Sequence, residues 1–307
     1  MNRTPLALVA ALGLLAACGE STTDSSAPET TADRPAATAE VEGPERIVSL
    51  SPSATEMRCA IGAGDQVVAV DSLSTFPPEA PVTDLSAYEP NLEAIADHDP
   101  DLVVVDGTDT VLIEGLDAIG IDVHEAPAPA TLDELYAQVE ELGAVTGHEE
   151  EAADLASEME ADIEAILAAV PERDEPLTYY HELDDLLYSI TSSTFLGELY
   201  ALAGLENVAD AADPEGASGG YPQLSAEYLV SADPDLVFLG DVKCCGQTAE
   251  TFASRPGFGD LSAVRGGNIV LLDDDVASRW GPRVVLLLDQ IVEAVVAASE
   301  DEDAAAA

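Results

Sequence analysis

The feature that most constrains the fold is an internal repeat, in which two similar stretches occur at a constant offset along the chain. The stretch from Asn91 to Val103 aligns without gaps with the stretch from Ser225 to Val237, and Asp-Pro-Asp-Leu-Val occurs in both copies. Each copy has the pattern of a short helix, a turn at Asp-Pro and a buried strand. A repeat of this kind predicts two lobes of similar construction. Chance similarity between two ordinary αβ units is the alternative.

Strand-like and helical runs alternate around the first copy of the repeat. Apolar, β-branched runs occur at Arg46–Leu50, Val67–Val70 and Leu102–Val105. A helix is expected to begin at Ser51, because a serine cap, a proline in the first turn and Glu56 three residues after Ser53 are typical of a helix start. Since strands that alternate with short helices form parallel sheets covered by helices, the sequence predicts an α/β fold.

A long helix is predicted between the lobes, over residues 148–171, where apolar residues recur with a period of 3.6 up to Pro171. At about 1.5 Å per residue, this helix is roughly 35 Å long. Because no partner helix of comparable length is apparent, we expect one rigid helix between an N-terminal lobe (44–147) and a C-terminal lobe (172–298), with a ligand cleft between the lobes. Packing in an antiparallel bundle is the alternative. An acidic, alanine-rich tail is expected over 299–307.

The net charge limits the partners of the protein. The chain has 61 acidic and 10 basic residues, a formal charge of −51, and its single lysine is Lys243. Such a field repels nucleic acid and anionic lipid headgroups, so neither is expected as a partner. Molar salt screens charge of this density, since the Debye length then falls to about 3 Å. The composition therefore favours a halophilic acidic protein, with an ordinary acidic secreted protein as the alternative.

The first residues predict export and a lipid anchor. The apolar run Leu6–Ala17 is too short to span a bilayer and is typical of a signal peptide. It ends in Leu-Ala-Ala-Cys-Gly, which is similar to a bacterial lipobox, where the cysteine, here Cys18, is lipidated after cleavage. We therefore expect a signal peptide over 1–17, a flexible tether over 18–43 and an extracytoplasmic body anchored to the cell membrane. A free Cys18 beside a failed cleavage site is the alternative.

Three cysteines remain for the folded body. The absence of a Cys-x-x-Cys pair argues against a zinc ribbon or an iron–sulfur site. Cys59 lies in a mostly apolar helical stretch, so a buried, inert thiol is expected. Cys244 and Cys245 are adjacent, and in an oxidising compartment they can form a strained vicinal disulfide.

Four segments carry a family resemblance. In chain order they are RIVSLSPSATEMRCAIGAGDQVVAVD, STFPPEAP, NLEAIADHDPDLVVV and ASRWGPR. Together they resemble the helical-backbone substrate-binding proteins of ABC importers, which include binding proteins for vitamin B12 and for ferric siderophores. The resemblance runs from about Arg46 to about Ala297. It implies two αβ lobes joined by a rigid helix, a ligand held in the cleft, and docking onto an ABC permease dimer with its ATPase.

The resemblance assigns a docking role to two glutamates. Glu93 and Glu227 match the two surface glutamates, one per lobe, that pair with permease arginines in this family. The internal repeat places them at equivalent positions, and a two-fold permease dimer requires matching charges on both lobes. Solvated surface charges are the alternative in a chain with so many acids.

The resemblance also assigns aromatic residues to the cleft. Tyr88 and Tyr221 match positions where vitamin B12 binders place tryptophans against the ligand, and an aromatic face offers flat apolar area to a large ring or chelate. The chain departs from that pattern at two positions, since Leu73 and Asp106 stand where further aromatics are expected.

Further ligand contacts are expected near the ends of strands and helices. Arg279 and Trp280 precede the last helix, and Arg279 is expected to pair with a carboxylate or phosphate of the ligand, with a structural Trp280 as the alternative. Tyr180 and His181 end a strand that is expected to point to the cleft, and Tyr188 follows shortly after. His181 or Tyr180 could ligate iron there, and a satisfied strand-end histidine is the alternative. A local positive region is expected from the basic residues clustered late in the chain: Lys243, Arg255, Arg265, Arg279 and Arg283.

Other functions fit the sequence less well. Gly216–Gly220 matches the esterase pattern G-x-S-x-G, but it lies in a Gly/Ala/Pro-rich loop and all four histidines precede Ser218. A bare divalent metal ion requires converging ligands that scattered histidines do not supply, and a purely structural lipoprotein is a further alternative. The sequence therefore predicts a lipid-anchored receptor, with no catalytic residue, cofactor or resident metal, that delivers a ferric siderophore, haem or cobalamin to a permease.

Overall fold

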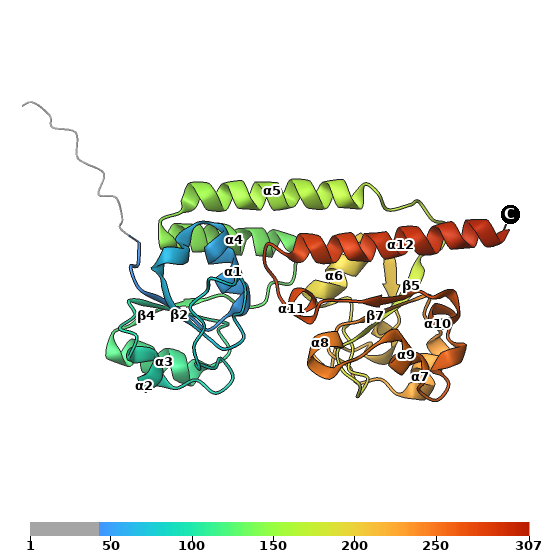
Figure 1. The fold of residues 1–307 in the computed structure, drawn as a ribbon, viewed down its shortest axis with the longest axis horizontal. Helices are drawn as coiled ribbons and strands as arrows, with labels where there is room; N and C mark the ends of the chain where they lie inside the picture. The colour runs from blue at the N-terminus through green and yellow to red at the C-terminus, as the bar shows by residue number, and fades with distance from the viewer. Residues whose placement is uncertain (1–42, 307) are drawn as a thin grey trace, which may run out of the picture. The chain divides into compact units, whose positions relative to one another are not determined.

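The computed structural model describes residues 43–306, with side chains up to Glu300. It contains two four-stranded parallel sheets (Figure 1). The N-terminal sheet has the order β2-β1-β3-β4, with strands β1 (Ile47–Ser49), β2 (Val67–Val70), β3 (Leu102–Val105) and β4 (Asp122–Glu125). The C-terminal sheet has the equivalent order β6-β5-β7-β8, with strands β5 (Leu177–Glu182), β6 (Leu205–Asn207), β7 (Leu236–Leu239) and β8 (Ile269–Leu271). The predicted α/β fold with two similar lobes is confirmed.

Helices cover the sheets and connect the lobes. The N-terminal lobe contains α1 (Pro52–Ala60), η1 (Ala63–Gln66), α2 (Leu92–Ala96), α3 (Thr110–Ile119) and α4 (Leu132–Thr146). The helix between the lobes is α5 (Glu149–Leu167). The C-terminal lobe contains α6 (Phe195–Leu202), η2 (Asp210–Ala212), α7 (Ala226–Ala232), α8 (Val242–Cys245), α9 (Ala249–Ala253), η3 (Phe258–Asp260), α10 (Ser262–Gly266) and α11 (Asp274–Ala277), and the chain continues into α12 (Val284–Ala306).

The internal repeat explains the similarity of the two lobes. Helices α2 and α7 begin at equivalent caps, because the side chains of Asn91 and Ser225 each accept a hydrogen bond from a backbone N–H of the first turn. After each helix an aspartate, Asp99 or Asp233, takes a left-handed conformation with φ of 47° or 45°. Aspartate tolerates this conformation better than most residues, which suits the turn before proline. The chain then enters β3 and β7, whose residues are buried throughout.

The second aspartate of the repeat joins neighbouring strands. The Asp101 carboxylate accepts hydrogen bonds from the backbone N–H groups of Glu45 at 2.8 Å and Arg46 at 3.0 Å, just before β1. The Asp235 carboxylate accepts one from the backbone N–H of Thr178 at 2.9 Å, near the start of β5. Each Asp-Pro-Asp-Leu-Val copy therefore fixes the start of its strand against the adjacent strand of the sheet.

Helix α5 packs against α4 and α12 (Figure 1). The expectation that it lacks a partner of comparable length is wrong, because α12 has 23 residues against 19 in α5 and continues through the residues expected to form a tail. Helices α4 and α5 approach closely at Gly143 of α4, where a Cβ atom would stand 2.3 Å from the Cβ of Ala152 in α5. A last helix was expected after Trp280, but its length was not, because its apolar residues, such as Val284–Leu288, form a nearly continuous run with no clear helical period.

One apolar core extends through both lobes. Its buried members include Ile47 and Val104 of the N-terminal sheet, Phe238 of the C-terminal sheet, Met159 of α5 and Leu288 of α12. The outer face of each sheet has a separate core. Because protein interiors are close-packed, a shared core resists relative movement of the lobes.

Candidate functional site

A cavity of about 680 Å³, here called cavity A, is lined by residues of both lobes. The N-terminal lobe supplies the segments that follow the carboxyl ends of its strands: Leu50–Ser53 after β1, Asp71 and Leu73 after β2, and Asp106 with Thr108–Thr110 after β3. The C-terminal lobe supplies Asp275 of α11 and the residues Ser278–Trp280 that follow it. Parallel sheets offer ligand sites at the carboxyl ends of their strands, and cavity A occupies such a position.

A second cavity of about 360 Å³, cavity B, shares Ser278, Arg279 and Trp280 with cavity A. Its remaining walls come from the loop Ala128–Ala130, Leu183 after β5, the start of α6, and the loop with Gly219 and Tyr221. Its lining is mostly apolar, whereas cavity A is rich in carboxylates. The two cavities therefore adjoin along the segment before α12 and differ in polarity.

Four of the expected ligand residues gather at these cavities. Tyr88 lines cavity A and is 83% exposed, and Tyr221 lines cavity B and is 51% exposed. Arg279 and Trp280 line both. Tyr188 lines neither cavity, and its backbone forms an antiparallel bridge with Gln223.

The structure does not place Tyr180 and His181 at a surface, so the expectation that either lines the cleft is corrected. Both lie in β5, which is covered on both faces. The Tyr180 hydroxyl donates to Glu182 Oε2 at 3.3 Å, and His181 Nδ1 lies 2.8 Å from the Tyr200 hydroxyl. Burial lowers the pKa of His181 to about 4, which keeps its imidazole neutral.

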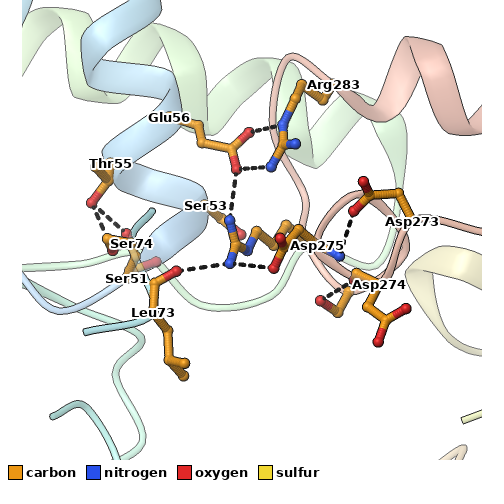
Figure 2. A network of polar contacts seen from close by, with 12 residues as sticks. Ser51, Ser53, Thr55, Glu56, Leu73, Ser74, Asp273, Asp274, Asp275 and Arg283 are labelled. Carbon is orange, nitrogen blue, oxygen red and sulfur yellow. Dashed lines mark hydrogen bonds and ion pairs between the residues drawn. The ribbon is translucent and has the colours of Figure 1, made fainter. Parts of the chain in front are cut away.

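An ionic network anchors Arg279 in the wall of both cavities (Figure 2). Arg279 Nη2 donates to Asp275 Oδ1 at 2.8 Å and to the Leu73 carbonyl at 2.7 Å, and Nη1 donates to Glu56 Oε1 at 3.2 Å. Because these partners belong to both lobes, Arg279 bridges the lobes. Its charge is balanced within the protein, which corrects the expectation that it is available to an anionic ligand.

Glu56 is the residue of the network that the sequence did not assign. The helix start expected at Ser51 is confirmed, since Ser51 caps α1, but Glu56 lies inside the helix and is only 3% exposed. Its carboxylate accepts hydrogen bonds from Arg279 and from both Nε and Nη2 of Arg283. Figure 2 shows Glu56 facing Arg283. These hydrogen bonds raise the pKa of Arg283. Two closely spaced arginines before the last helix, Arg279 and Arg283, could have indicated a buried carboxylate nearby. The sequence could not identify that carboxylate, because Glu56 lies far earlier in the chain and in the other lobe.

The net electrostatic character of cavity A is acidic. Its lining contains four carboxylates (Asp71, Asp106, Asp109 and Asp275) and one guanidinium, that of Arg279. Burial raises the pKa of Asp71. The positive region expected from the late basic residues is not present in the structure, because four of them are paired with carboxylates: Lys243 with Asp273 and Asp275, Arg255 with Glu182, and Arg279 and Arg283 with Glu56.

Glu93 and Glu227 occupy equivalent exposed positions. Each lies in the first turn of a short helix, α2 or α7, that starts from a capping side chain. Figure 1 places α2 and α7 on the side of their lobes away from α5 and α12. Neither glutamate lines cavity A or cavity B.

The alternative functions can be compared with the described residues. Ser218 lies in the loop between η2 and α7, and its hydroxyl donates to Asp213, so it is not at the strand-to-helix turn of an esterase nucleophile. Within residues 43–306, no group of three or more His, Cys, Asp or Glu residues is arranged to hold a metal ion. The structure joins the sulfurs of Cys244 and Cys245 in a disulfide, and Cys59 is half-buried with a free thiol.

Several expectations concern residues outside the described range, namely the signal peptide 1–17, lipidation of Cys18 and the tether up to residue 42. Among the described helices, none is long and apolar enough to cross a bilayer.

Comparison with known proteins places this fold and site in a family. A family model described as periplasmic binding protein matches residues 47–276, from β1 to α11. This chain belongs to the periplasmic binding protein family. The match includes both copies of the repeat and most of the segments that line the two cavities, and it confirms the family resemblance of the sequence.

Individual relatives cover most of the chain. A protein of Halobacterium salinarum named cobalamin-binding protein is 34% identical over 255 residues, which cover 79% of this chain and 67% of that protein. An ABC transporter substrate-binding lipoprotein of Bacillus subtilis, YvrC, is 29% identical over 261 residues, 82% of this chain and 80% of the relative. The solved periplasmic heme-binding protein RhuT of Roseiflexus has a TM-score of 0.72 at 26% identity and covers 83% of this chain and 99% of that one.

Proposed function

We propose that this protein is the substrate-binding lipoprotein of an ABC importer and that it binds a corrinoid such as cobalamin between its lobes. The acidic lining of cavity A is the observation that carries the choice of ligand. Four carboxylates face one guanidinium, and that guanidinium is already bonded to Glu56 and Asp275. An anionic ligand would meet unfavourable charge at this surface, whereas a ligand with amide donors would find acceptors.

The candidate chelates differ in this chemistry. Haem has two propionate carboxylates, and many ferric siderophore complexes are anionic. Cobalamin has amide side chains, whose N–H groups can donate to Asp71, Asp106 or Asp109. The aromatic residues Tyr88, Tyr221 and Trp280 supply flat apolar area for a macrocycle. The name of the Halobacterium salinarum relative, cobalamin-binding protein, supports the same choice.

Calorimetric titration with cyanocobalamin, haemin and a ferric siderophore tests the ligand class. We expect cyanocobalamin to bind most tightly. Tyr221→Ala and Trp280→Ala should each weaken its binding by about 2 kcal/mol, roughly thirtyfold, because buried aromatic anchors commonly contribute this much. Tyr221→Phe is the matched control, since it keeps the ring. Tighter binding of haemin or of an anionic siderophore, or unchanged affinity in both alanine variants, would contradict the proposal.

The delivery step rests on Glu93 and Glu227. Charge reversal at either, Glu93→Arg or Glu227→Arg, should cut import of labelled cobalamin while affinity stays within about twofold, because both side chains lie outside the two cavities. Glu158→Arg, on the exposed side of α5, is the matched control. Normal import by both reversed variants would show that the protein does not dock through these residues.

The membrane anchor rests on Cys18, which follows the signal-like apolar run. The relative YvrC is described as a lipoprotein, which supports this part of the proposal. Cys18→Ser should release the protein from the membrane fraction into the medium, and mass spectrometry of the mature N-terminus should find a lipid on Cys18 of the parent. A parent protein without lipid would contradict the anchor.

A further inference from the structure

The segment after β7 is the C-terminal counterpart of a segment that lines cavity A. The residues of the two repeat copies correspond at a constant offset, the one that separates Asn91 from Ser225. At this offset the bounds of β3 correspond to those of β7. Ala87, which lines cavity A, likewise corresponds to Tyr221, which lines cavity B. After β3, the residues that line cavity A are Asp106, Thr108, Asp109 and Thr110. Their counterparts at the same offset are Gly240, Val242, Lys243 and Cys244, so the pseudo-symmetry of the fold places α8 at the ligand side of its sheet.

Helix α8 lines neither cavity, but it is held against α11, which contributes Asp275 to the wall of cavity A. The Asp274 carboxylate accepts hydrogen bonds from the backbone N–H groups of Lys243 at 2.8 Å and Cys244 at 2.7 Å. The Lys243 ammonium lies 3.1 Å from Asp275 Oδ2, and the other oxygen of Asp275 contacts Arg279. Figure 1 shows α8 beside α11, on the side of the C-terminal lobe that faces the N-terminal lobe. The position of α8 is therefore coupled to residues that line the cavity.

The disulfide lies on the exposed surface of α8. Lys243, Cys244, Cys245 and Gly246 are all exposed, and no core residue covers them. Lys243 pairs with Asp273 and Asp275, and beside it the two bonded sulfurs form an uncharged, polarisable patch in an acidic region. Sulfur in such a position makes favourable contacts with aromatic rings at about 5 Å. A disulfide between adjacent residues presents both sulfurs in a fixed arrangement, which lowers the entropic cost of contact.

We propose that the Cys244–Cys245 disulfide is a ligand-contacting element of the C-terminal lobe, which packs its sulfurs against a conjugated or aromatic face of the chelate. This inference rests on the proposed function. It assigns a specificity role to the disulfide, because an uncharged sulfur surface favours an apolar ring over the charged edge of a ligand. A purely structural disulfide on the outside of the lobe would have no such effect.

The experiment compares the parent, the double variant Cys244→Ser/Cys245→Ser and the control Cys59→Ser by calorimetric titration with cyanocobalamin. We expect the double variant to bind about five- to tenfold more weakly, in line with the energy of sulfur–aromatic contacts. Cys59→Ser should bind as the parent does. Equal affinity of the parent and a folded double variant would overturn the inference.

A second measurement on the parent decides the case in which the double variant fails to fold. Hydrogen–deuterium exchange over residues 240–248 should slow when cyanocobalamin is added, and unchanged exchange there would overturn the inference. A parent that binds none of the chelates would overturn the proposed function together with this inference, whereas a parent that binds one without involving α8 would overturn this inference alone.

Discussion

Glu56→Gln is the substitution that tests the ionic bridge between the lobes. The Glu56 side chain is 2% exposed, and its carboxylate accepts hydrogen bonds from Arg279 Nη1 at 3.2 Å and from Arg283 Nε at 2.8 Å. Glutamine keeps the shape of the side chain but removes the charge, and its NH₂ group would face guanidinium donors. We therefore expect the variant to lose most of the stabilisation that the carboxylate contributes.

The magnitude follows from the burial of the partners. Removing one member of a buried ion pair costs about 3–5 kcal/mol. Arg279 keeps Asp275 as a partner, and the Arg279 and Arg283 side chains are 9% and 18% exposed, so the lower end of that range applies. A loss of about 3 kcal/mol lowers the melting temperature by roughly 6–12 °C for a domain of this size.

Thermal unfolding followed by circular dichroism at neutral pH and molar salt measures this change. Glu158→Gln, an exposed glutamate of α5, is the matched control and should melt within about 1 °C of the parent. A Glu56→Gln variant that melted with the control would refute the reasoning, because the network would then contribute nothing to the attachment of the segment before α12.

Three further predictions concern charge. Both Asp241 carboxylate oxygens are buried without a hydrogen-bond partner among the described residues, and burial together with Glu182 raises the Asp241 pKa from 3.8 to about 6. Because the pKa is raised in the folded state, the parent loses stability as the pH rises between these two values. In urea unfolding at pH 8, the free energy of unfolding of Asp241→Asn should therefore exceed that of the parent by about 1–3 kcal/mol. At pH 4 the two proteins should be equally stable. Arg58 is fully buried, and its guanidinium has no hydrogen-bond partner among the described residues. Burial lowers the pKa of Arg58 to about 9. Arg58→Met should therefore stabilise the protein by about 1–4 kcal/mol at pH 7, because it removes an unpaired buried charge. This gain should shrink as the pH passes 9, and a destabilised variant would indicate an unseen anionic partner. Finally, the formal charge of −51 predicts a melting temperature that rises from low to molar salt, and an unchanged value would contradict the halophilic interpretation.

The fold was predictable because short runs of residues mark its strands and because the same pattern occurs in both lobes. The bounds of β2 and β3 match the predicted strands, since both strands are short β-branched runs buried on both faces. The repeat extended the prediction to the second lobe, where β7 occupies the position equivalent to β3 in the second copy. The last helix was expected to follow Trp280, but the length of α12 was not, because it is apolar over most of its first turns and lacks the amphipathic period by which α5 was found.

The site was less predictable because its residues meet only through tertiary contacts. Tyr88 and Tyr221 were identified by family resemblance, and Arg279 and Trp280 by their place before the last helix. The partner of Arg279 could not be identified among the many acids of the chain. The two residues placed wrongly, Tyr180 and His181, belong to a strand with no exposed face. Such a strand has no alternation of polar and apolar residues that would tell which side chains reach the cleft.

The scarcity of basic residues gives their positions a physical meaning. In a chain with 61 acids and 10 basic residues, Arg279, Arg283 and Arg255 hold buried carboxylates, and Lys243 holds the turn next to the cleft. Molar salt screens the repulsion between exposed acids, but it screens buried pairs much less. The contacts that join the lobes should therefore persist under the conditions in which the acidic surface is tolerated. The same distribution leaves cavity A acidic, because the one cation in its lining is used to join the lobes and not to attract an anionic ligand.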